Sequence, residues 1–177
     1  MPTGGNQWVL TLASRLYLEQ IALTNQKIAE LTQAIHSQAR SNTDTQRLLT
    51  IPGVGPVTAM AITAFAPAME TFERGRNFSA WLGLVPKQHS TVGRQILGRT
   101  SKMGQKDIRR LLIIGAMSVI KAALKKGVPE HSWLGRLLAR KSRMVAGVAL
   151  ANKMARTIWA VLISNDVYRD PEAGVAA

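Results

Sequence analysis

The amino-acid sequence predicts an all-α protein, in which a long, coiled-coil-like N-terminal helix precedes a bundle of five or six helices with a basic, glycine-rich loop. Three observations lead to this prediction. Residues 8–38 contain neither proline nor glycine, and apolar runs with helical spacing recur between residues 46 and 165. Glycine and proline lie between those runs, where they end helices and open turns. Hydrophobic residues make up 46% of the 177 residues, which is enough for a buried core.

The first predicted helix has mostly apolar residues in alternating steps of four and three. This is heptad spacing over about three repeats, at Tyr17, Ile21, Thr24, Ile28, Leu31 and Ile35. Two structures fit it: a coiled coil that pairs with a second copy of the chain and makes a homo-oligomer, or an amphipathic helix that packs on its own domain. The polar threonine in the stripe slightly favours the second structure, and the spacing leaves both open.

The helical spacing breaks at residues 41–44, where Ser, Asn, Thr and Asp follow one another. These residue types are favoured at the N-terminal cap of a helix, so a second helical unit is expected to begin here. The sequence therefore predicts a long helix over residues 1–43, a helical domain over residues 44–169, and a flexible tail over residues 170–177.

The second unit opens with a pattern typical of a helix-hairpin-helix, a motif that binds the DNA backbone without reading base sequence. A short helix at 46–50 ends before Pro52, two glycines follow at Gly53 and Gly55, and Pro56 is well placed to open the next helix. Glycines let the backbone approach a phosphate, and the amides at the next helix's N-terminus point toward it. The alternative is a glycine-rich packing turn without a ligand, because no Lys or Arg directly follows Gly55.

The rest of the domain alternates between broken and helical stretches. Glycines and Pro86 interrupt residues 69–104, which predicts a short helix near residues 79–84 and then either a long loop or a pair of short strands. Three further helices are expected at residues 108–125, 133–141 and 145–165.

Positive charge is concentrated in one part of the chain. The net charge is +13, and residues 86–143 contain fourteen Lys or Arg against Asp107 and Glu130, so this segment holds +12 of it. Such an excess favours a polyanionic partner, with nucleic acid ahead of an anionic membrane surface. Aromatic residues are only 5% of the chain, which argues against an RNA-binding sheet that stacks bases on exposed rings.

Several other classes of site are disfavoured by composition. The chain has no cysteine, and its three histidines, His36, His89 and His131, are widely separated, so neither a metal site nor a bound cofactor is predicted. No signal peptide is recognisable, and Lys153 and Arg156 interrupt the longest apolar tract, which argues against a membrane span. We therefore expect a cytoplasmic protein without a membrane partner.

The glycine-rich basic stretch contains hydroxyl groups among cations. A serine that attacks a phosphodiester needs an accessible position, positive charge to hold the phosphate, and a base or metal to take its proton. Ser90 has the first two in the local sequence, with Arg94, Arg99 and Lys102 as candidate phosphate clamps. The spacing alone is equally typical of a loop that contacts phosphate through a hydrogen-bonding serine without chemistry.

Several motifs of this domain occur in a distinctive order: IPGVGP at 51–56, WLGLVPKQHST at 81–91, LGR at 97–99, SK at 101–102 and ALANKMAR at 149–156. Over about residues 16–169 the chain resembles the C-terminal domain of the DEDD transposases related to Piv DNA invertases. The resemblance implies a recombinase guided by a bridge RNA and active in the bacterial cytoplasm, at the nucleoid. It further implies an N-terminal RuvC-like domain with four carboxylates for Mg²⁺, and a C-terminal serine that links covalently to a DNA 5′ phosphate.

Carried onto this sequence, the serine role falls on the hydroxyl pair Ser90-Thr91, with Ser90 the first choice and Thr91 the alternative one position later. The expected nucleic-acid contacts come from the glycine turn and the nearby cations: Gly53, Gly55, Lys87, Arg94, Arg99, Lys102, Lys106, Arg109 and Arg110. The chain departs from the family pattern where Val92 replaces a common glycine, Arg94 a common lysine, and Met103 a basic residue. No departure removes a hydroxyl or reverses a charge.

The carboxylates of the implied metal site are not found in this sequence. Before Thr45 the acidic residues are Glu19, Glu30 and Asp44, and one helix cannot assemble a four-carboxylate site from them. The chain is therefore expected to supply half of an active site, with DNA and guide RNA as partners and the carboxylate domain provided in cis or in trans. The alternative function is a stand-alone, non-catalytic helical protein that binds nucleic acid or oligomerises.

Overall fold

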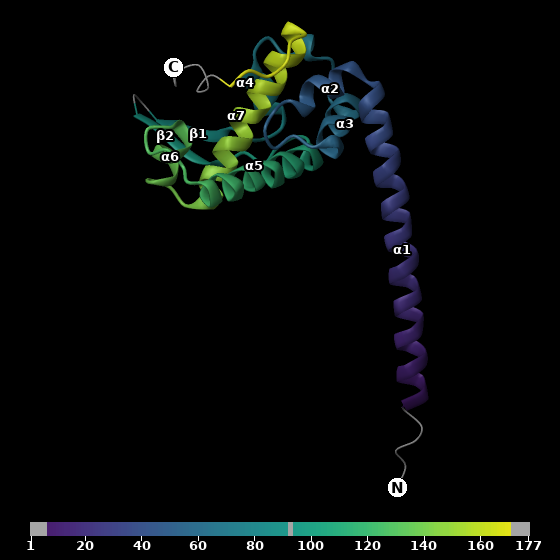
Figure 1. Ribbon diagram of the computed structural model, residues 1–177. Coiled ribbons are helices and arrows are strands. Elements are labelled where there is room, and N and C mark those ends of the chain that lie inside the picture. The colour runs from purple at the N-terminus through teal and green to yellow at the C-terminus, as the bar shows by residue number, and fades with distance from the viewer. Residues whose placement is uncertain (1–6, 92–93, 171–177) are drawn as a thin grey trace. The chain divides into compact units, whose positions relative to one another are not determined.

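The computed structural model describes residues 7–91 and 94–170, which form seven α-helices, one short 3-10 helix and two strands (Figure 1). The predicted all-α class is confirmed. The chain divides into two compact units, residues 1–38 and residues 39–177. Apart from Asp170, the tail predicted at 170–177 lies outside the described residues.

The first unit is almost entirely one helix. Helix α1 spans Gln7–Ser41, and its 35 residues give it a length of about 52 Å at 1.5 Å per residue. Exposed ion pairs within the helix support it, with 3.1 Å between Arg15 Nε and Glu19 Oε1 and 2.8 Å between Lys27 Nζ and Glu30 Oε2. The long N-terminal helix is therefore confirmed; its pairing as a coiled coil stays a prediction.

Helix α1 ends where the sequence predicts a break. The side chain of Asn42 caps the next helix, α2 (Thr43–Leu49), because its Oδ1 accepts a hydrogen bond of 2.9 Å from the amide of Thr45. Ala39, near the end of α1, is already buried in the second unit.

The second unit is built around two long helices, α5 (Lys106–Lys126) and α7 (Arg143–Ser164), which pack on each other (Figure 1). Shorter helices surround them: α3 (Pro56–Phe65), α4 (Gly75–Trp81) and α6 (Trp133–Leu138). Helix α5 buries Ile108, Leu112, Ala116 and Ile120, which recur every fourth residue and so form one stripe. Leu48, Ile62, Met154 and Ile158 are other members of the same core.

Aromatic side chains fix the segment between α3 and α5. Phe72, Phe78 and Trp81 lie with ring centroids 5.2–5.9 Å apart, and the 3-10 helix η1 (Met69–Thr71) precedes them. The indole N–H of Trp159 donates to the carbonyls of Met69 and Phe72, at 3.2 and 3.0 Å. This packing explains why the helix predicted at 79–84 instead runs over Gly75–Trp81: the aromatic contacts order an earlier segment, and Gly83, at φ +70°, ends it.

The glycine-rich stretch forms an antiparallel hairpin, so of the two structures that the sequence allowed, the pair of short strands is the one observed. Strand β1 (Pro86–Thr91) pairs with β2 (Arg94–Thr100), with Pro86 opposite Thr100 and Thr91 opposite Arg94. The register is irregular between Pro86 and Gln88, which marks a bulge near the base of the hairpin.

Among the described residues, α7 is the one helix whose length and composition would let it cross a membrane. Its side chains at Ala151, Met154 and Ile158 are nevertheless buried in the core, and Lys153 and Arg156 lie on the same helix. These are the features of a central helix in a folded domain.

Candidate nucleic-acid interface and serine site

The glycine turn between α2 and α3 is anchored in the core. Ile51 and Val54 are 3% and 5% exposed, and the amide of Val54 donates to the carbonyl of Ile51 at 3.0 Å. Gly53 has φ +85°, and a Cβ at this position would lie 2.9 Å from the carbonyl oxygen of Gly115 in α5. A Cβ on Gly115 would in turn lie 2.0 Å from the carbonyl oxygen of Gly53. These two glycines are required because the turn lies directly against α5.

Gly55 has a different environment from Gly53. A Cβ built on Gly55 would meet no heavy atom within 4 Å, and Gly55 occupies the N-cap of α3 without a side-chain hydrogen bond. Arg47, the basic residue of α2, is paired with Asp44 and Asn165. Of the two glycines predicted to contact nucleic acid, Gly53 has a packing role, and Gly55 is the one with space beside it.

The hairpin is held firmly at its base. A Cβ on Gly83 would lie 2.1 Å from the carbonyl oxygen of Met103, and a Cβ on Gly104 would lie 1.8 Å from the carbonyl oxygen of Trp81. The segment that follows β2 is therefore pressed against the turn that precedes β1. The side-chain amide of Asn152 in α7 adds a hydrogen bond of 3.1 Å to the carbonyl of Leu84.

The two candidate nucleophiles are consecutive residues at the end of β1. In the backbone pairing Ser90 lies opposite Gln95, and Thr91 lies opposite Arg94. The side chains of Ser90, Thr91, Arg94 and Arg99 lie outside what the structure describes, as does Val92. The structure therefore places these residues on one anchored hairpin through its backbone alone.

The remaining predicted contacts lie near the hairpin base and the first turn of α5. Lys87, Lys102, Lys106 and Arg110 are exposed, and no described acidic side chain forms an ion pair with any of them. Arg109 differs, because it is half-buried and its Nη1 donates to the carbonyl of Leu82 at 3.0 Å. Arg109 thus helps to hold the end of α4, a role that sequence reasoning missed.

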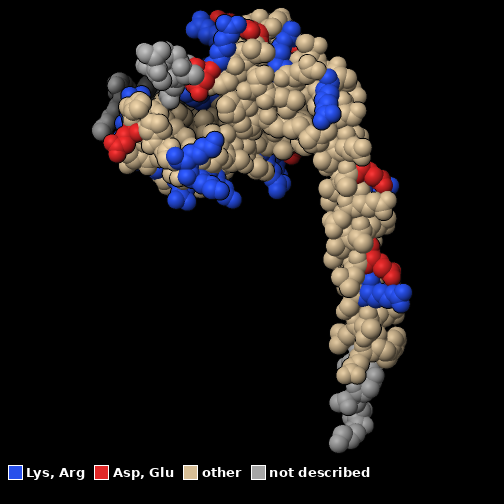
Figure 2. All heavy atoms as spheres, viewed as in Figure 1, with Lys and Arg blue, Asp and Glu red and all other residues tan. Residues whose placement is uncertain are grey.

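The positive charge that the sequence concentrates in one segment is divided in space between the two ends of α5. One group, the hairpin-base cations, comprises Lys87, Lys102, Lys106 and Arg110. The other, the distal cations, lies at the C-terminal end of α5 and on the segment that leads into α7: Lys121, Lys125, Lys126, Arg136, Arg140, Lys141 and Arg143. Helix α5 is about 30 Å long, so Lys106 and Arg110 near its start and Lys125 and Lys126 at its end can contact separate stretches of a polyanion. Figure 2 shows Lys and Arg gathered along the edge of the unit where Figure 1 places α5.

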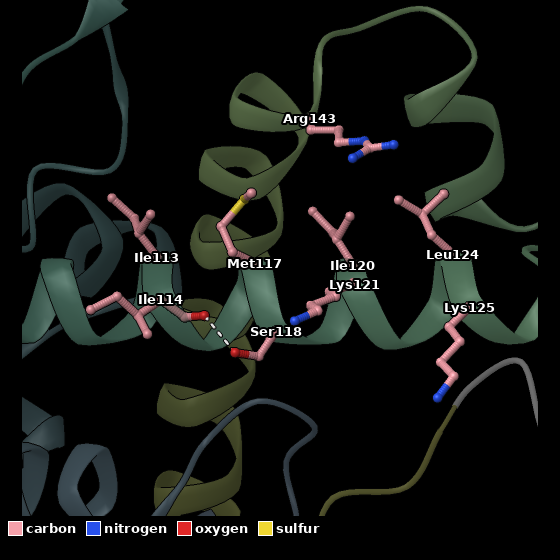
Figure 3. A pocket seen from close by; sticks show the side chains of 9 residues that line it. All are labelled: Ile113, Ile114, Met117, Ser118, Ile120, Lys121, Leu124, Lys125 and Arg143. Carbon is pink, nitrogen blue, oxygen red and sulfur yellow. Dashed lines mark hydrogen bonds between the residues drawn. The ribbon is translucent and has the colours of Figure 1, made fainter.

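A groove accompanies the distal cations. It has a volume of about 670 Å³, and its apolar floor includes Met117 and the partly exposed Ile114 and Leu124. Lys121 and Arg143 lie at its rim, with Arg143 reaching over from the start of α7 (Figure 3). Because its floor is apolar, this groove differs from a surface that binds only the phosphates of a nucleic acid.

No metal site is formed within residues 7–91 and 94–170. In this part of the chain no three His, Cys, Asp or Glu side chains come together in a way that could hold an ion. Asp107, the acidic residue closest to the hairpin in sequence, is exposed in the first turn of α5. The described residues therefore do not fit the Mg²⁺ site that the resemblance implies.

The region that contains the glycine turn and the hairpin is similar to known proteins. Residues 45–128 match the Transposase IS116/IS110/IS902 family. A protein named as a probable family 20 transposase of Pseudomonas aeruginosa is 43% identical over 151 residues, which are 85% of this chain and 45% of that protein. The transposase for insertion sequence element IS1111A of Coxiella burnetii is 38% identical over 145 residues, or 82% of this chain and 40% of its own length.

The transposase for insertion sequence element IS1328 of Yersinia enterocolitica is 33% identical over 161 residues, which are 91% of this chain and 48% of that protein. The chain thus spans less than half the length of each of these relatives. The family match runs from the first turn of α2 through the end of α5, and so includes the glycine turn, the hairpin and the hairpin-base cations. Residues 45–128 therefore form a domain of the IS116/IS110/IS902 transposase family, in a chain whose relatives are named as transposases, two of them of insertion sequence elements.

Proposed function

We propose that this chain is the DNA-binding part of an insertion-sequence transposase and that the β1–β2 hairpin carries its serine nucleophile, Ser90. The observation that carries the proposal is the family match over residues 45–128, which includes an anchored hairpin with exposed, unpaired cations at its base. Lys102, Lys106 and Arg110 would hold the DNA backbone, and Gly55 would allow a phosphate to approach the start of α3. We place this activity in the bacterial cytoplasm.

The proposed reaction is a phosphoryl transfer onto the serine. The Oγ of Ser90 attacks the phosphorus of a phosphodiester, a serine–phosphate bond forms, and the bond from phosphorus to the 3′ oxygen breaks. The proton that leaves Ser90 is balanced by the proton that the 3′ oxygen gains, and the DNA 5′ phosphate stays on the protein. Attack by the 3′ hydroxyl of another strand reverses these steps and joins new ends.

A serine hydroxyl is a weak nucleophile at neutral pH and needs an activating group. The described residues contain no metal-binding cluster. We therefore propose that a RuvC-like carboxylate domain, in cis or in trans, completes the site. The separation between hairpin-base and distal cations supports two polyanionic partners, DNA at the hairpin and a guide RNA at the distal end of α5.

The test is a covalent adduct between protein and DNA. The chain is incubated with 5′-labelled and 3′-labelled DNA, alone and together with a carboxylate-bearing domain and Mg²⁺, and the products are separated under denaturing conditions. We expect no adduct from the chain alone and an adduct on the 5′ phosphate side when the second domain is present. An adduct from the isolated chain would contradict the half-site proposal.

Two variants separate the candidate nucleophiles. Ser90→Ala should abolish the adduct while DNA binding persists, and Thr91→Ala should retain the adduct. The two hydroxyls belong to neighbouring residues, so removing each in turn tells which of them forms the bond to phosphate. An adduct that survives in Ser90→Ala and disappears in Thr91→Ala assigns the nucleophile to Thr91 instead.

The second candidate function is a non-catalytic protein that binds nucleic acid and oligomerises. The exposed apolar stripe of α1 favours it, because such a stripe gains stability by pairing with a second copy. If the chain binds DNA and self-associates but forms no adduct with any carboxylate domain supplied, this second function is the better description.

A further inference from the structure

A pocket lies between the base of the hairpin and the N-terminal half of α7. Its volume is about 740 Å³, within the range of roughly 300–1,000 Å³ that is typical of small-molecule sites. The hairpin side is formed by Leu84, Pro86, Gly98 and Thr100, with Lys102 just beyond, and the helix side by Met144, Val145, Val148, Ala149 and Asn152. None of the described residues that line it is acidic.

The walls of this pocket suit a flat, largely apolar group with a polar edge. Met144 and Val145 are 60% and 51% exposed, so apolar surface is left open in a strongly basic domain. Polar groups are few: the hydroxyl of Thr100, the amine of Lys102 and the carboxamide of Asn152. Asn152 uses its Nδ2 to bind the carbonyl of Leu84, and no described donor is bonded to its Oδ1.

The backbone around the pocket is held in place at an energetic cost. Lys102 has φ +52°, a left-handed conformation that is uncommon for residues other than glycine. Its amide donates to the carbonyl of Gly83 at 3.3 Å, and the close approach of Gly83 to Met103 holds this segment against the domain. Residues held in this way often lie in ligand-binding sites, because the surrounding structure must compensate for the strain.

The pocket is also close to the proposed nucleophile along the hairpin. Ser90 is four residues from Pro86 on β1, which corresponds to about 13 Å at 3.3 Å per residue. The pocket therefore lies within a few nucleotides of a phosphate bound at Ser90.

We propose that this pocket receives a nucleobase that is turned out of the DNA beside the phosphate engaged by the hairpin. The inference rests on the proposed DNA-binding function and adds a second contact between the protein and the DNA. The base would lie between Met144, Val145 and Val148, and its polar edge would bond with Thr100 and the Oδ1 of Asn152. Lys102 at the mouth would neutralise the phosphate of the same nucleotide.

The charge distribution favours this occupant over a protein segment. An acidic peptide would be drawn to the distal cations, where an apolar groove with Lys121 and Arg143 at its rim is already present. Among the described residues that line the hairpin pocket, the one cation is Lys102, beside polar acceptors, which matches one nucleotide. A turned-out nucleotide also brings its own phosphate to the hairpin, so one ligand would fill the apolar pocket and contact Lys102 at the same time.

The test uses 2-aminopurine, a fluorescent base whose emission is quenched when it stacks on its neighbours in DNA. The probe is a short duplex with one 2-aminopurine opposite a mismatched base, because mismatched bases leave the stack at lower cost. Fluorescence anisotropy of an end label reports total binding, and 2-aminopurine emission at saturation reports the position of the base. We expect emission to rise several-fold on binding, since none of the described residues that line the pocket is aromatic and could quench it.

A filling variant and a matched control test the location. Ala149→Phe places a ring in the pocket, and we expect the emission increase to disappear while binding by anisotropy changes less than twofold. Ala122→Phe adds the same ring at an exposed position of α5 outside the pocket, and it should leave both signals unchanged. Met144→Glu, at an exposed position that does not threaten the fold, should also remove the emission increase.

The two measurements test the nucleobase pocket and the proposed DNA binding separately. If the duplex binds but emission stays quenched, or if emission rises equally in the wild type and in Ala149→Phe, the nucleobase assignment is overturned and the proposed DNA binding stands. If anisotropy shows no binding, the proposed function falls and the pocket assignment falls with it. A folded state for each variant is checked by circular dichroism.

Discussion

Helices α1 and α5 both carry a stripe of apolar residues at helical spacing, but they differ in what covers those residues. In α5, Ile108 and Leu112 are 1% and 0% exposed, whereas in α1 the stripe residues Ile21 and Ile28 are 54% and 56% exposed. Helix α5 is covered because glycines at Gly115 and Gly147 let a turn and α7 approach closely. Periodicity therefore predicts a helix and its apolar stripe, while small residues elsewhere decide what covers the stripe.

The largest effect on stability should come from deleting buried volume in α5. Leu112→Ala should lower the free energy of unfolding by about 2–5 kcal/mol, the range for a fully buried leucine. The equivalent change in α1, Ile28→Ala, should alter it by less than about 0.5 kcal/mol, because that side chain is already exposed within the chain. Urea titration of both variants at low protein concentration measures the difference. Equal losses would show that the stripe of α1 is buried after all.

The next largest effect on stability should come from the close contact between Gly53 and Gly115, which lets the glycine turn pack on α5. Gly115→Ala should cost roughly 1–3 kcal/mol, because its Cβ would lie 2.0 Å from the carbonyl oxygen of Gly53 and the turn would have to move. Gly55→Ala has open space, so it should cost less than about 1 kcal/mol.

The same pair of variants separates packing from binding. If a phosphate approaches the start of α3, Gly55→Ala should weaken DNA binding several-fold while stability is nearly unchanged. DNA affinity that is identical in Gly55→Ala and the wild type would mean that the turn serves packing alone.

Cations at the two ends of α5 can be removed without deleting buried side chains, because they are exposed. Replacing Arg99, Lys102 and Lys106 together by Gln should reduce the slope of log K against log salt by up to about 2.7, since each lost phosphate contact removes about 0.9. The matched triple variant at Lys121, Lys125 and Lys126 should leave the slope for a short DNA duplex nearly unchanged, if those cations bind a different nucleic acid. An unchanged slope in the first variant would contradict the assignment of Arg99, Lys102 and Lys106 to DNA binding.

Much of the fold was predictable because its signals are local. The cap at Asn42, the proline that opens α3 and the glycine that ends α5 lie within a few residues of the boundaries that they set, and the predicted helices appear there. The position of α4 was wrong by several residues because it depends on contacts between Phe72, Trp81 and the distant Trp159.

The candidate site was predictable as a set of cations and hydroxyls, but its arrangement was not. Arg109 and Gly53 were predicted to contact nucleic acid, and the structure gives each a packing partner that is far away in the sequence. Asn152 belongs to a recognisable motif, yet its bond to Leu84 joins residues 68 positions apart. Such pairings cannot be inferred from one sequence without an alignment. Gly83 and Gly104 were the available signal, because paired glycines around a hairpin often mark a close backbone approach.

The smallest expected effect on folding stability comes from a change in the apolar stripe of α1, where α5 has a covering helix and α1 has none among the described residues. Ile21, Ile28 and Leu31 form an exposed stripe, and covering such a stripe with a second copy would remove apolar surface from water at about 25 cal/mol per Å². Ile28→Asp would place a charge in that seam, where burial without a partner is strongly unfavourable. We therefore expect sedimentation equilibrium to show a lower mass for Ile28→Asp than for the wild type, with the same unfolding midpoint for the compact unit.

Gln33→Asp is the matched control, because it adds the same charge at an exposed position on the opposite side of the heptad, and it should leave the mass unchanged. If the wild type and Ile28→Asp have equal masses, α1 does not pair with a second copy, and its stripe must be covered by some other partner or remain open.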